Sequence, residues 1–530
     1  MTELLTAAQM QALEKGAIER GEVSGLELME QAGRGTVDAI FGAWPEMSDG
    51  DHTALVLCGP GNNGGDGYVV ARLLKEKGWS IEVYHLGDPE KLPPDARKNF
   101  ERWTSSGPVV PIEDDAVSAR INELQGTDIV VDGLFGTGLI RPFNAFPNIQ
   151  MALNDAGHFS PAEDEYPRVV ALDMPSGFDG TSGRLLSHEA TDERNFFAHA
   201  PRANLTVTFH SCKSGHYLAA GPEGCGKLAC VDIGLKAELE PDANVVSLAE
   251  PEITALKKAS DHKYSHGHAI IVSGGVGKTG AARLAARGAL RVGSGLVTVI
   301  CPSPALSEVA TQATAIMCRP ILSSKDLADQ LTDDRLNAIC IGPGLGLDED
   351  AKQLVLTALK AGRSTVLDAD ALTVFESDPE SLFESLRPNT VITPHAGEFR
   401  RLFPDIAEKL SAPAKAGPAY SKVDATREAA VRAGCTILFK GPDTVISDES
   451  GNCLINSSAY ERSAPWLATA GSGDVLAGFI TGLLARGFAA LQAAETGAWL
   501  HTECAISYGP GLIAEDLPEE LPKVFSSLGV

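Results

Sequence analysis

Apolar and polar residues follow a repeated order along the chain, which predicts strands, glycine-rich loops and helices in succession. Residues 5–44 carry apolar side chains at helical spacing. Residues 53–59 (TALVLCG) then form a short apolar run that ends in a glycine-rich turn, and helical spacing resumes at YVVARLLKEKG. The pattern therefore predicts a strand, a loop and a helix.

Further apolar runs rich in β-branched residues follow at helix-length intervals. They lie at 80–86, 128–136, 168–177 and 205–212. Strands that alternate with helices favour a parallel sheet with crossover connections. The first part of the chain is thus predicted to be an α/β domain with a Rossmann-like parallel sheet, in which residues 143–167 add a helix and an acidic surface loop.

A charged, proline-bearing stretch at 236–260 interrupts this order, and we interpret it as a linker and the lead-in to a second domain. From His268 the alternation resumes, which predicts a second α/β domain that is longer than the first. The expected domains are residues 1–240 and 241–530. The apolar runs of the second domain are HAIIVSGG, GLVTVICPS, AICIGPG, STVLDADAL, TVITPHAGE and CTILFKG.

Composition limits the class of protein and its partners. A chain of 530 residues exceeds the size of a single core, and 44% apolar residues are too many for a disordered chain. A net charge of −26 disfavours nucleic acid and anionic membranes as partners, so any phosphate must be bound locally. The chain has no apolar run of about 18 residues and carries Glu3 where a signal peptide carries lysines, so we expect a cytoplasmic protein.

The ten cysteines include no CxxC pair, so neither a zinc site nor a disulfide framework is indicated. Gly59, Gly61 and Gly64 satisfy GxGxxG between a predicted strand and helix, with Glu82 about twenty residues further on. This pattern favours a dinucleotide site, and a tight turn without a ligand is the structural alternative. The loops at 62–66, 132–142 and 172–177 also follow predicted strands, and such loops converge on the ligand crevice of an open parallel sheet.

The motifs NNGGDG, DGLFGTGLIRP, LDMPSGFD and TFHSCKSGH, within about 5–235, resemble those of the NAD(P)HX epimerase domain. The resemblance implies a potassium ion held by Asn63, Asp132 and Ser176, whose oxygens suit a hard cation. It also implies that the hydrated cofactor contacts Asp173 and two loops. These loops consist of Asn62, Asn63, Gly64, Gly65 and Asp66, and of Gly136, Thr137, Gly138, Leu139, Ile140, Arg141 and Pro142.

Exchange of the two C6 epimers requires proton transfer at the oxygen of the ring hydroxyl group, and Asp173 is our acid/base candidate. A helix N-cap is the structural alternative for this residue. Lys213 either supplies charge to the substrate or is a solvated surface lysine. Two other interpretations of this domain remain open: an NAD-dependent dehydrogenase that uses GxGxxG and Glu82, and a binding module without catalytic activity.

In the second domain, GGVGKTG (274–280) is not a P-loop, because Val272 stands where that motif needs glycine. Lys278 is therefore interpreted as a solvated loop lysine. The string TAGSGDVLAGFITGLLARG (469–487) places a glycine-rich turn before an apolar helix, with Asp474 in its first turn. Backbone amides there suit an anion, and the aspartate can accept a proton from an attacking hydroxyl.

That string resembles the signature of ribokinase-like enzymes. Together with 265–299, IGPGLG, LDADAL, TPHAGEF and FKGPDTVI, it is similar to the ADP/ATP-dependent NAD(P)HX dehydratase domain over about 260–515. The resemblance implies that Ala281, Gly346, His395 and Asp474 contact the hydrated nucleotide. It places the adenine nucleotide at Lys440, Gly441, Pro442, Asp443, Thr444 and Gly473. Lys278 departs from the family pattern GMTGAA, and its effect on phosphate contact or nucleotide choice stays open.

These resemblances imply repair of hydrated NADH and NADPH. The first domain would exchange the epimers, and Asp474 of the second would assist phosphorylation of the C6 hydroxyl by ADP (or ATP) with Mg²⁺ before elimination. The alternative is a small-molecule kinase of the vitamin or sugar type with a regulatory or binding N-terminal domain. Whether the chain forms a homo-oligomer is also left open.

Overall fold

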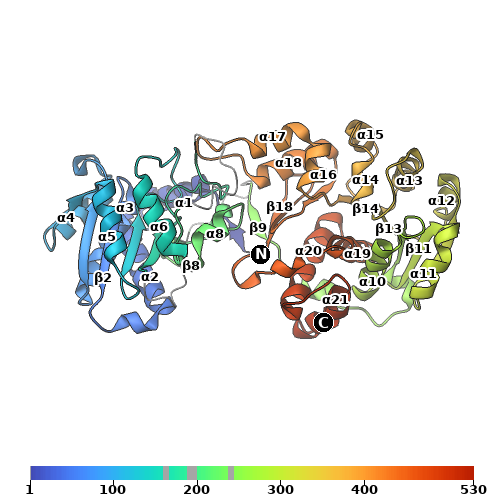
Figure 1. The fold of residues 1–530 in the computed structure, drawn as a ribbon, viewed down its shortest axis with the longest axis horizontal. Helices are drawn as coiled ribbons and strands as arrows, with labels where there is room; N and C mark the ends of the chain where they lie inside the picture. Colours follow the sequence, from blue (N-terminus) through green and yellow to red (C-terminus); the bar gives the residue numbers. More distant parts are fainter. Residues whose placement is uncertain (1, 159–165, 188–199, 237–243) are drawn as a thin grey trace. The chain divides into compact units, whose positions relative to one another are not determined.

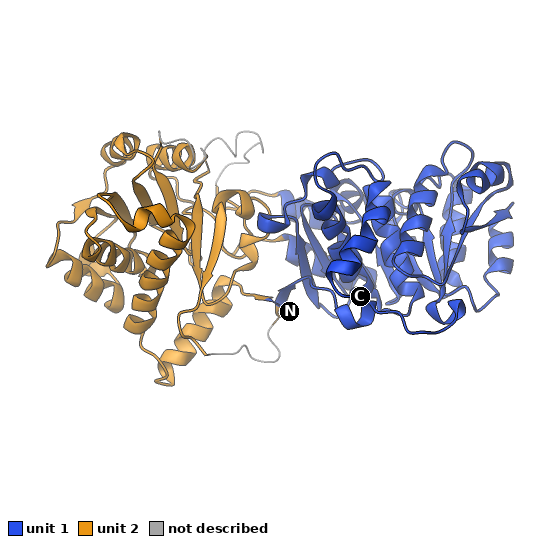
Figure 2. Ribbon diagram, turned by 90° about the horizontal axis from the view of Figure 1, so that it is seen from below, with its two compact units in different colours: residues 1–2, 246–411, 422–530 blue, residues 3–245, 412–421 orange. Residues whose placement is uncertain are grey.

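The computed structural model describes residues 2–158, 166–187, 200–236 and 244–530. It divides into two compact units (Figure 2). Unit 1 contains residues 1–2, 246–411 and 422–530, and unit 2 contains residues 3–245 and 412–421. The domain boundary that we expect at residue 240 falls within 237–243, and the expected acidic loop falls largely within 159–165. Both segments lie outside the described residues.

Unit 2 is built on a seven-stranded sheet in which all neighbouring strands are parallel. The strand order is β4-β3-β2-β5-β6-β7-β8, so the direction of winding reverses between β2 and β5. Ligands of open parallel sheets bind beyond the carboxyl ends of the strands at such a reversal. The strands are β2 (Thr53–Cys58), β3 (Ser80–His85), β4 (Val110–Pro111), β5 (Ile129–Gly133), β6 (Arg168–Leu172), β7 (Leu205–Phe209) and β8 (Lys227–Val231).

Helices cover both faces of this sheet (Figure 1). In β2, Val56 packs with side chains of α2 and α3, whereas Leu57 packs with side chains of α5 and α6. Successive residues of a strand point to opposite faces, so a strand buried on both sides needs an unbroken apolar run. The helices are α1 (Ala7–Glu19), α2 (Gly25–Ala43), α3 (Asn62–Glu76), α4 (Pro94–Thr104), α5 (Asp114–Glu123), α6 (Pro147–His158) and α8 (Gly221–Cys225).

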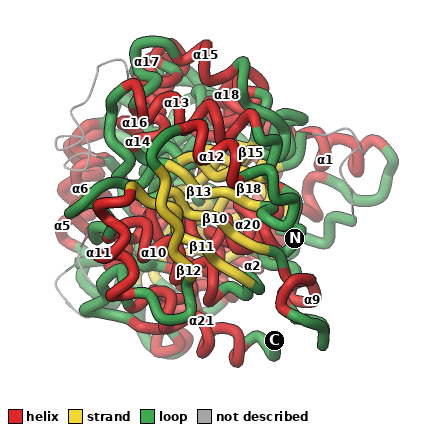
Figure 3. Tube along the Cα trace, turned by 90° about the vertical axis from the view of Figure 1, so that its right-hand side faces the viewer, coloured by secondary structure: helices red, strands yellow, loops and turns green. Residues whose placement is uncertain are grey.

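The sheet of unit 1 is parallel over most of its width and contains the antiparallel hairpin β17–β18 near one edge. Its strands follow the order β9-β18-β17-β16-β15-β14-β13-β10-β11-β12, with β9 parallel to β18. Figure 3 shows β10, β11, β12 and β13 side by side. The strands are β9 (Val246–Leu248), β10 (His268–Val272), β11 (Leu296–Pro302), β12 (Met317–Ile321), β13 (Ala338–Ile341), β14 (Ser364–Leu367), β15 (Thr390–Ile392), β16 (Thr436–Phe439), β17 (Asp443–Ser447) and β18 (Cys453–Ser457).

Helices α10, α19 and α20 share one large apolar core with this sheet. Helix α19 is apolar around its whole circumference, and all of its residues from Val475 to Ala485 are buried. The helices are α9 (Ile253–Leu256), α10 (Gly280–Arg291), α11 (Leu306–Gln312), α12 (Ser324–Gln330), α13 (Glu349–Lys360), α14 (Asp370–Thr373), α15 (Pro379–Phe383), α16 (Ala396–Leu402), α17 (Pro404–Ser411), α18 (Lys422–Ala433), α19 (Ser472–Ala485), α20 (Ala490–Tyr508) and α21 (Asp516–Ser527).

The α/β fold class and the predicted parallel sheet of the first domain are confirmed. Within the stretch 236–260, interpreted as a linker and lead-in, residues 246–248 form an unpredicted strand, β9, beside the β17–β18 hairpin. Three residues in a charged context carry too weak a pattern to predict a strand. Among the described residues, no helix has the length and apolar content that crossing a bilayer requires.

Candidate functional site

In unit 2, the loops that follow β2, β5 and β6 enclose a cavity of about 390 Å³. The cavity is also lined by Glu14 of α1, by Phe209 at the end of β7 and by Lys213 in the turn after β7. Most of the residues expected to bind the hydrated cofactor line this cavity. They are Asn62, Asn63, Asp66, Gly136, Thr137, Gly138, Leu139, Ile140, Arg141 and Asp173.

The remaining expected residues of these loops do not line the cavity. Gly64 and Gly65 are buried beneath it, where a Cβ at Gly64 would lie 2.1 Å from the carbonyl oxygen of Gly59. A Cβ at Gly65 would meet the sulfur of Met29 at 2.6 Å. These two glycines let the start of α3 pack closely against its surroundings, and Pro142 is absent from the cavity lining.

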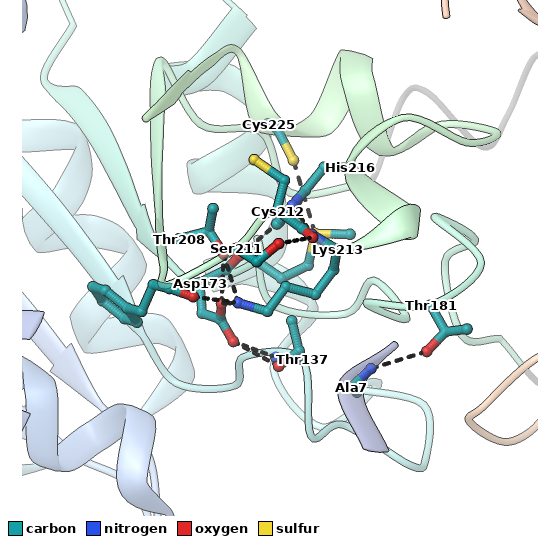
Figure 4. Close-up of polar contacts among 12 residues, drawn as sticks. Ala7, Thr137, Asp173, Thr181, Thr208, Ser211, Cys212, Lys213, His216 and Cys225 are labelled. Carbon is teal, nitrogen blue, oxygen red and sulfur yellow. Dashed lines mark hydrogen bonds and ion pairs between the residues drawn. The ribbon is translucent and has the colours of Figure 1, made fainter. Parts of the chain in front are cut away.

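Asp173 stands at the end of β6 with a φ of 64°, in the left-handed region. For a residue other than glycine this conformation costs about 1–3 kcal/mol, and such strain concentrates at functional sites. Figure 4 shows its carboxylate surrounded by donors: Oδ2 accepts from the Thr137 hydroxyl (2.6 Å), and Oδ1 accepts from Thr208 (2.8 Å) and from Lys213 (2.8 Å). These partners belong to other segments, so the interpretation of Asp173 as a helix N-cap is wrong.

Lys213 is buried, with 1% of its side chain exposed, so its interpretation as a solvated surface lysine is wrong. Its ammonium also donates to the Thr208 hydroxyl (2.8 Å) and the Phe209 carbonyl (3.1 Å). The Lys213 backbone N–H donates to Nδ1 of His216, so Nε2 of His216 carries the proton and donates to the Asp173 carbonyl (2.8 Å). Side chain and backbone of Asp173 are thus both fixed.

Two aspartates in this cavity have pKa values shifted in opposite directions. Burial acts to raise the pKa of Asp173, but the charge of Lys213 and hydrogen bonds from Lys213 and Thr137 hold it well below its usual value. Burial raises the pKa of Asp66 well above its usual value, and the charges of Glu14 and Asp173 raise it further. Asp66 therefore keeps its proton to a higher pH than Asp173 does.

The three residues expected to hold potassium lie at the start of α3 (Asn63), in β5 (Asp132) and in the loop after β6 (Ser176). The Ser176 hydroxyl donates to Asp132 Oδ1 (2.6 Å), and the Ser176 backbone N–H donates to Oδ2 (2.8 Å). The side-chain amide of Asn63 lies 3.3 Å from the N–H of Gly136. Carboxylate, hydroxyl and amide oxygens form a donor set that fits a hard cation. The described residues include no cluster of three or more His, Cys, Asp or Glu side chains placed to hold a metal.

Glu82 does not support the dehydrogenase interpretation. Its carboxylate forms an ion pair with Arg120 (2.7 Å), and it does not line the cavity. A ribose-binding acid would need to face the crevice.

In unit 1, Asp474 lies in the first turn of α19, directly after Gly471 in the left-handed conformation (φ 89°) and Ser472–Gly473. A Cβ at Gly473 would lie 3.6 Å from Lys440 Nζ and 4.0 Å from Asp368 Oδ2. Burial raises the pKa of Asp474 to about 6, with a further increase from the charge of Asp368. This residue is thus a carboxylate whose pKa approaches neutrality, as a general base requires.

Lys440 connects the acidic groups of this site. Its ammonium lies 2.6 Å from Asp368 Oδ1 and 3.9 Å from Glu398 Oε2. Burial acts to lower the pKa of Lys440, but the charges of Asp368 and Glu398 raise it above its usual value. The Thr393 hydroxyl donates to Asp368 Oδ1 (2.8 Å), the same oxygen that contacts Lys440.

The loop after Lys440 is held by its own polar contacts. The Thr444 hydroxyl donates to the Gly441 carbonyl (2.7 Å), and Lys422 donates to Asp443 Oδ1 (2.7 Å). The Pro442 carbonyl accepts from Ser458 (2.7 Å). The expected nucleotide-binding segment is therefore an ordered turn between β16 and β17, and Gly473 faces its first residue.

The expected contacts to the hydrated nucleotide lie on three other elements. Gly346 (φ 100°) donates its N–H to Asp370 Oδ2 (2.9 Å), and Ala281 is in the first turn of α10. His395 is half exposed, and its Nδ1 accepts from the Gly397 amide (2.9 Å) as the N-cap of α16. His395 Nε2 also lies 3.3 Å from Glu398, so it has a structural role beside any contact with substrate.

Family models match both halves of the chain. Residues 269–523 match the model described as NAD(P)H-hydrate dehydratase, and residues 25–215 match the YjeF-related protein N-terminus. A bifunctional NAD(P)H-hydrate repair enzyme of Coxiella burnetii is 32% identical over 529 residues, covering 98% of each chain. The chain belongs to the bifunctional NAD(P)H-hydrate repair enzymes.

Other known proteins match single halves of the chain. An NAD(P)H-hydrate epimerase of Rhodobacter capsulatus is 42% identical over 219 residues, covering 41% of this chain and 92% of its own. A crystal structure of an ADP/ATP-dependent NAD(P)H-hydrate dehydratase from Bacillus subtilis, co-crystallised with ATP/Mg²⁺, is 26% identical. It covers 53% of this chain and 99% of its own, with a TM-score of 0.44. The family assignment and the two α/β halves predicted from the motifs are confirmed.

Sequence reasoning missed several residues of the repair enzyme's two sites. Lys213 lies 40 residues from Asp173 in sequence, so no local pattern connects the two. Asp368 lies within LDADAL, which by itself indicates no role for it, and Glu14 lies in a helix with no visible motif. Asp368 could have been identified from the sequence, because it is an acidic residue directly after a predicted strand.

Proposed function

We propose that this chain repairs hydrated NADH and NADPH with two activities. Unit 2 exchanges the R and S epimers of the hydrate, and unit 1 dehydrates the S epimer at the expense of ADP (or ATP). Membership of the bifunctional family supports both activities. The geometric observation that carries the dehydratase assignment is Asp474, a carboxylate of raised pKa at the start of α19 beside Lys440 and Asp368.

In unit 1, Asp474 would accept the proton of the C6 hydroxyl while that oxygen attacks the terminal phosphorus of the nucleotide. The bond between that phosphorus and its bridging oxygen breaks, which releases AMP from ADP or ADP from ATP. Phosphate then leaves C6 as C5 loses a proton, so the ring double bond is restored. Lys440 and the amides before Asp474 would stabilise phosphoryl charge. The carboxylates of Asp368 and Asp474 would help to hold magnesium, which supplies further positive charge for the phosphoryl group.

In unit 2, exchange at C6 requires the oxygen of the C6 hydroxyl group to gain and lose a proton. We assign Asp66 as the proton donor, because it lines the cavity and retains its proton to higher pH. Asp173 is assigned as the ionised carboxylate that stabilises positive charge on the ring, since Lys213 keeps it ionised. This division refines the initial acid/base hypothesis for Asp173, because a depressed pKa makes it a poor proton donor.

Potassium would be held in unit 2 by Asn63, Asp132 and Ser176. These side chains supply oxygen donors of the type that such a cation prefers. A cation there would compensate the buried charge of Asp132, whose pKa is raised by burial despite hydrogen bonds from Ser176. A cation held by these side chains would help to order the start of α3 and the loop after β5, which both line the cavity.

The test is the recovery of absorbance at 340 nm from an epimer mixture of hydrated NADH. The purified protein is supplied with ADP and Mg²⁺, with ATP and Mg²⁺, or with no nucleotide. Complete, nucleotide-dependent recovery would support both activities and name the phosphoryl donor. Partial recovery would support the dehydratase alone, and no recovery with either nucleotide would overturn the proposed function.

A further inference from the structure

A short segment, residues 412–421, packs within unit 2 although it lies in sequence between α17 and α18 of unit 1 (Figure 2). We call residues 412–421 the strap. The epimerase matches from Rhodobacter capsulatus and Roseobacter litoralis extend over 219 and 245 residues, or 41% and 44% of this chain. Matches of that length in the N-terminal half do not reach the strap. The strap is therefore outside the part of the chain that those single-domain epimerases share.

The strap contacts one of the loops that line the epimerase cavity. The Gly417 N–H donates to the Ile140 carbonyl (3.1 Å). A Cβ at Gly417 would lie 2.6 Å from the Leu139 carbonyl oxygen, so the two backbones are in close contact. On the inner side of the strap, Ala414 and Ala419 form an apolar cluster with Leu139 and Leu186. Leu139 and Ile140 both line the cavity.

Polar contacts fix both ends of the strap to the loop that follows Asp173. The guanidinium of Arg184 donates to the carbonyls of Tyr420 (3.1 Å) and Ala412. The Ala419 N–H donates to Asp179 Oδ2 (3.2 Å), and the Ser182 hydroxyl donates to the same oxygen (2.6 Å). Ser187 donates its N–H to the Ala414 carbonyl (2.9 Å), which closes the set.

These contacts have a physical consequence for the cavity wall. Ile140 is 65% exposed, so apolar burial of its own side chain does not hold its part of the loop in place. The loop is held instead by the hydrogen bond from Gly417 and by burial of the Leu139 side chain against Ala414 and Ala419 of the strap. Exposed loops without such support sample several conformations. A ligand that needs one geometry of the cavity wall then binds more weakly, because binding must order the loop.

We propose that the strap is a positioning element of the epimerase site, which sets the backbone of Leu139 and Ile140 for the hydrated dinucleotide. This inference rests on the proposed epimerase function. Gly417 and Arg184 are positioning residues and do not touch the reacting atoms. The strap acts on substrate affinity, whereas proton transfer at Asp66 and Asp173 is left intact.

Gly417→Ala tests the inference, because the added methyl group displaces the Leu139 carbonyl. We expect the KM of epimer exchange to rise about tenfold, with kcat changed less than about twofold, the pattern of lost binding that is equal in ground and transition states. Dehydration of the pure S epimer with ADP should keep its wild-type constants. Lys415→Ala, which removes an exposed side chain of the same strap, is the matched control and should change neither reaction.

Arg184 supplies a second, independent variant. Arg184→Ala should raise the KM of exchange, and Arg184→Lys should restore part of it, because one ammonium can reach one of the two carbonyls. If the wild-type protein exchanges no epimers, the proposed function fails. If the wild-type protein does exchange epimers, two results would overturn the inference about the strap. One is that Gly417→Ala and Arg184→Ala leave the KM of exchange unchanged. The other is that they lower only the thermal midpoint and kcat.

Discussion

Each unit places an aspartate in its candidate site, but their surroundings shift the pKa values of these two carboxylates in opposite directions. Asp173 contacts a buried lysine and two threonine hydroxyls, which stabilise its ionised form. Asp474 is close to another carboxylate, and its nearest cation, Lys440, is already paired with Asp368, so its pKa rises to about 6. The comparison teaches that the residue type alone does not assign a proton role, whereas the charges within a few ångströms do.

The largest effect is expected from Asp474→Asn. Loss of the proton acceptor should lower the rate of dehydration about 10⁴-fold, at the upper end for removal of a general base. Rapid-quench measurement of AMP formed from ADP checks this directly. Epimer exchange in the same variant should stay at the wild-type rate, and a loss of both activities would mean that the variant is misfolded or that one site serves both reactions.

Lys213→Met should strongly destabilise unit 2, because it leaves the Asp173 carboxylate buried without its cation. Removing one partner of a buried ion pair costs about 3–5 kcal/mol. The folded pKa of Asp173 lies below its unfolded value, so the pair contributes stability above about pH 4 and loses it as the pH falls. Urea unfolding between pH 3 and 7 should therefore show a weaker acid-side slope in the variant. The exposed Lys415→Met is the control, and equal slopes in both variants would contradict the pairing.

Asp173→Asn should lower the rate of epimer exchange about 10²-fold, at the lower end for loss of an acid/base group, because Asp66 remains in the cavity. Dehydration of the pure S epimer should be unaffected. Chromatographic separation of the R and S forms over time measures the exchange. An unchanged rate would favour the interpretation of unit 2 as a binding module without catalysis.

The pH dependence of dehydration should follow Asp474. Because its ionised form is the active base, kcat/KM should rise with pH through about 6 and then level off. The charge of Lys440 lowers this pKa, so Lys440→Met should move the rise to higher pH. Lys278→Met, at an exposed lysine of the same unit, should leave the profile in place, and an unshifted profile in Lys440→Met would remove Lys440 from the site.

The smallest effect is expected from Thr137→Val, which removes one of the donors to Asp173. A hydrogen bond to a charged group is worth about 1.5–3 kcal/mol, so exchange should slow about tenfold. Thr181→Val is the control, because its hydroxyl accepts from the Ala7 N–H instead. Equal rates in the two variants would show that the Thr137 hydroxyl does not tune the carboxylate.

Most strands and the loops at their carboxyl ends were predictable. Strands buried on both faces require unbroken apolar runs, as at β2 and β10, and the glycines and polar residues that follow mark where the chain turns over the sheet. The family motifs covered these same loops. The short strand β9 and the β17–β18 hairpin were harder, because their residues gain a pattern only from their neighbours in the sheet.

The sequence by itself determined the α/β fold, the family and the loops that carry the two sites, because apolar periodicity and local motifs depend on neighbours along the chain. Tertiary structure alone decided which groups face one another: Lys213 and Asp173, Lys440 and Asp368, and the strap against Leu139. The physical reason is that ionisation and loop position depend on distances of a few ångströms between residues that are tens to hundreds of positions apart. No local pattern encodes such a distance.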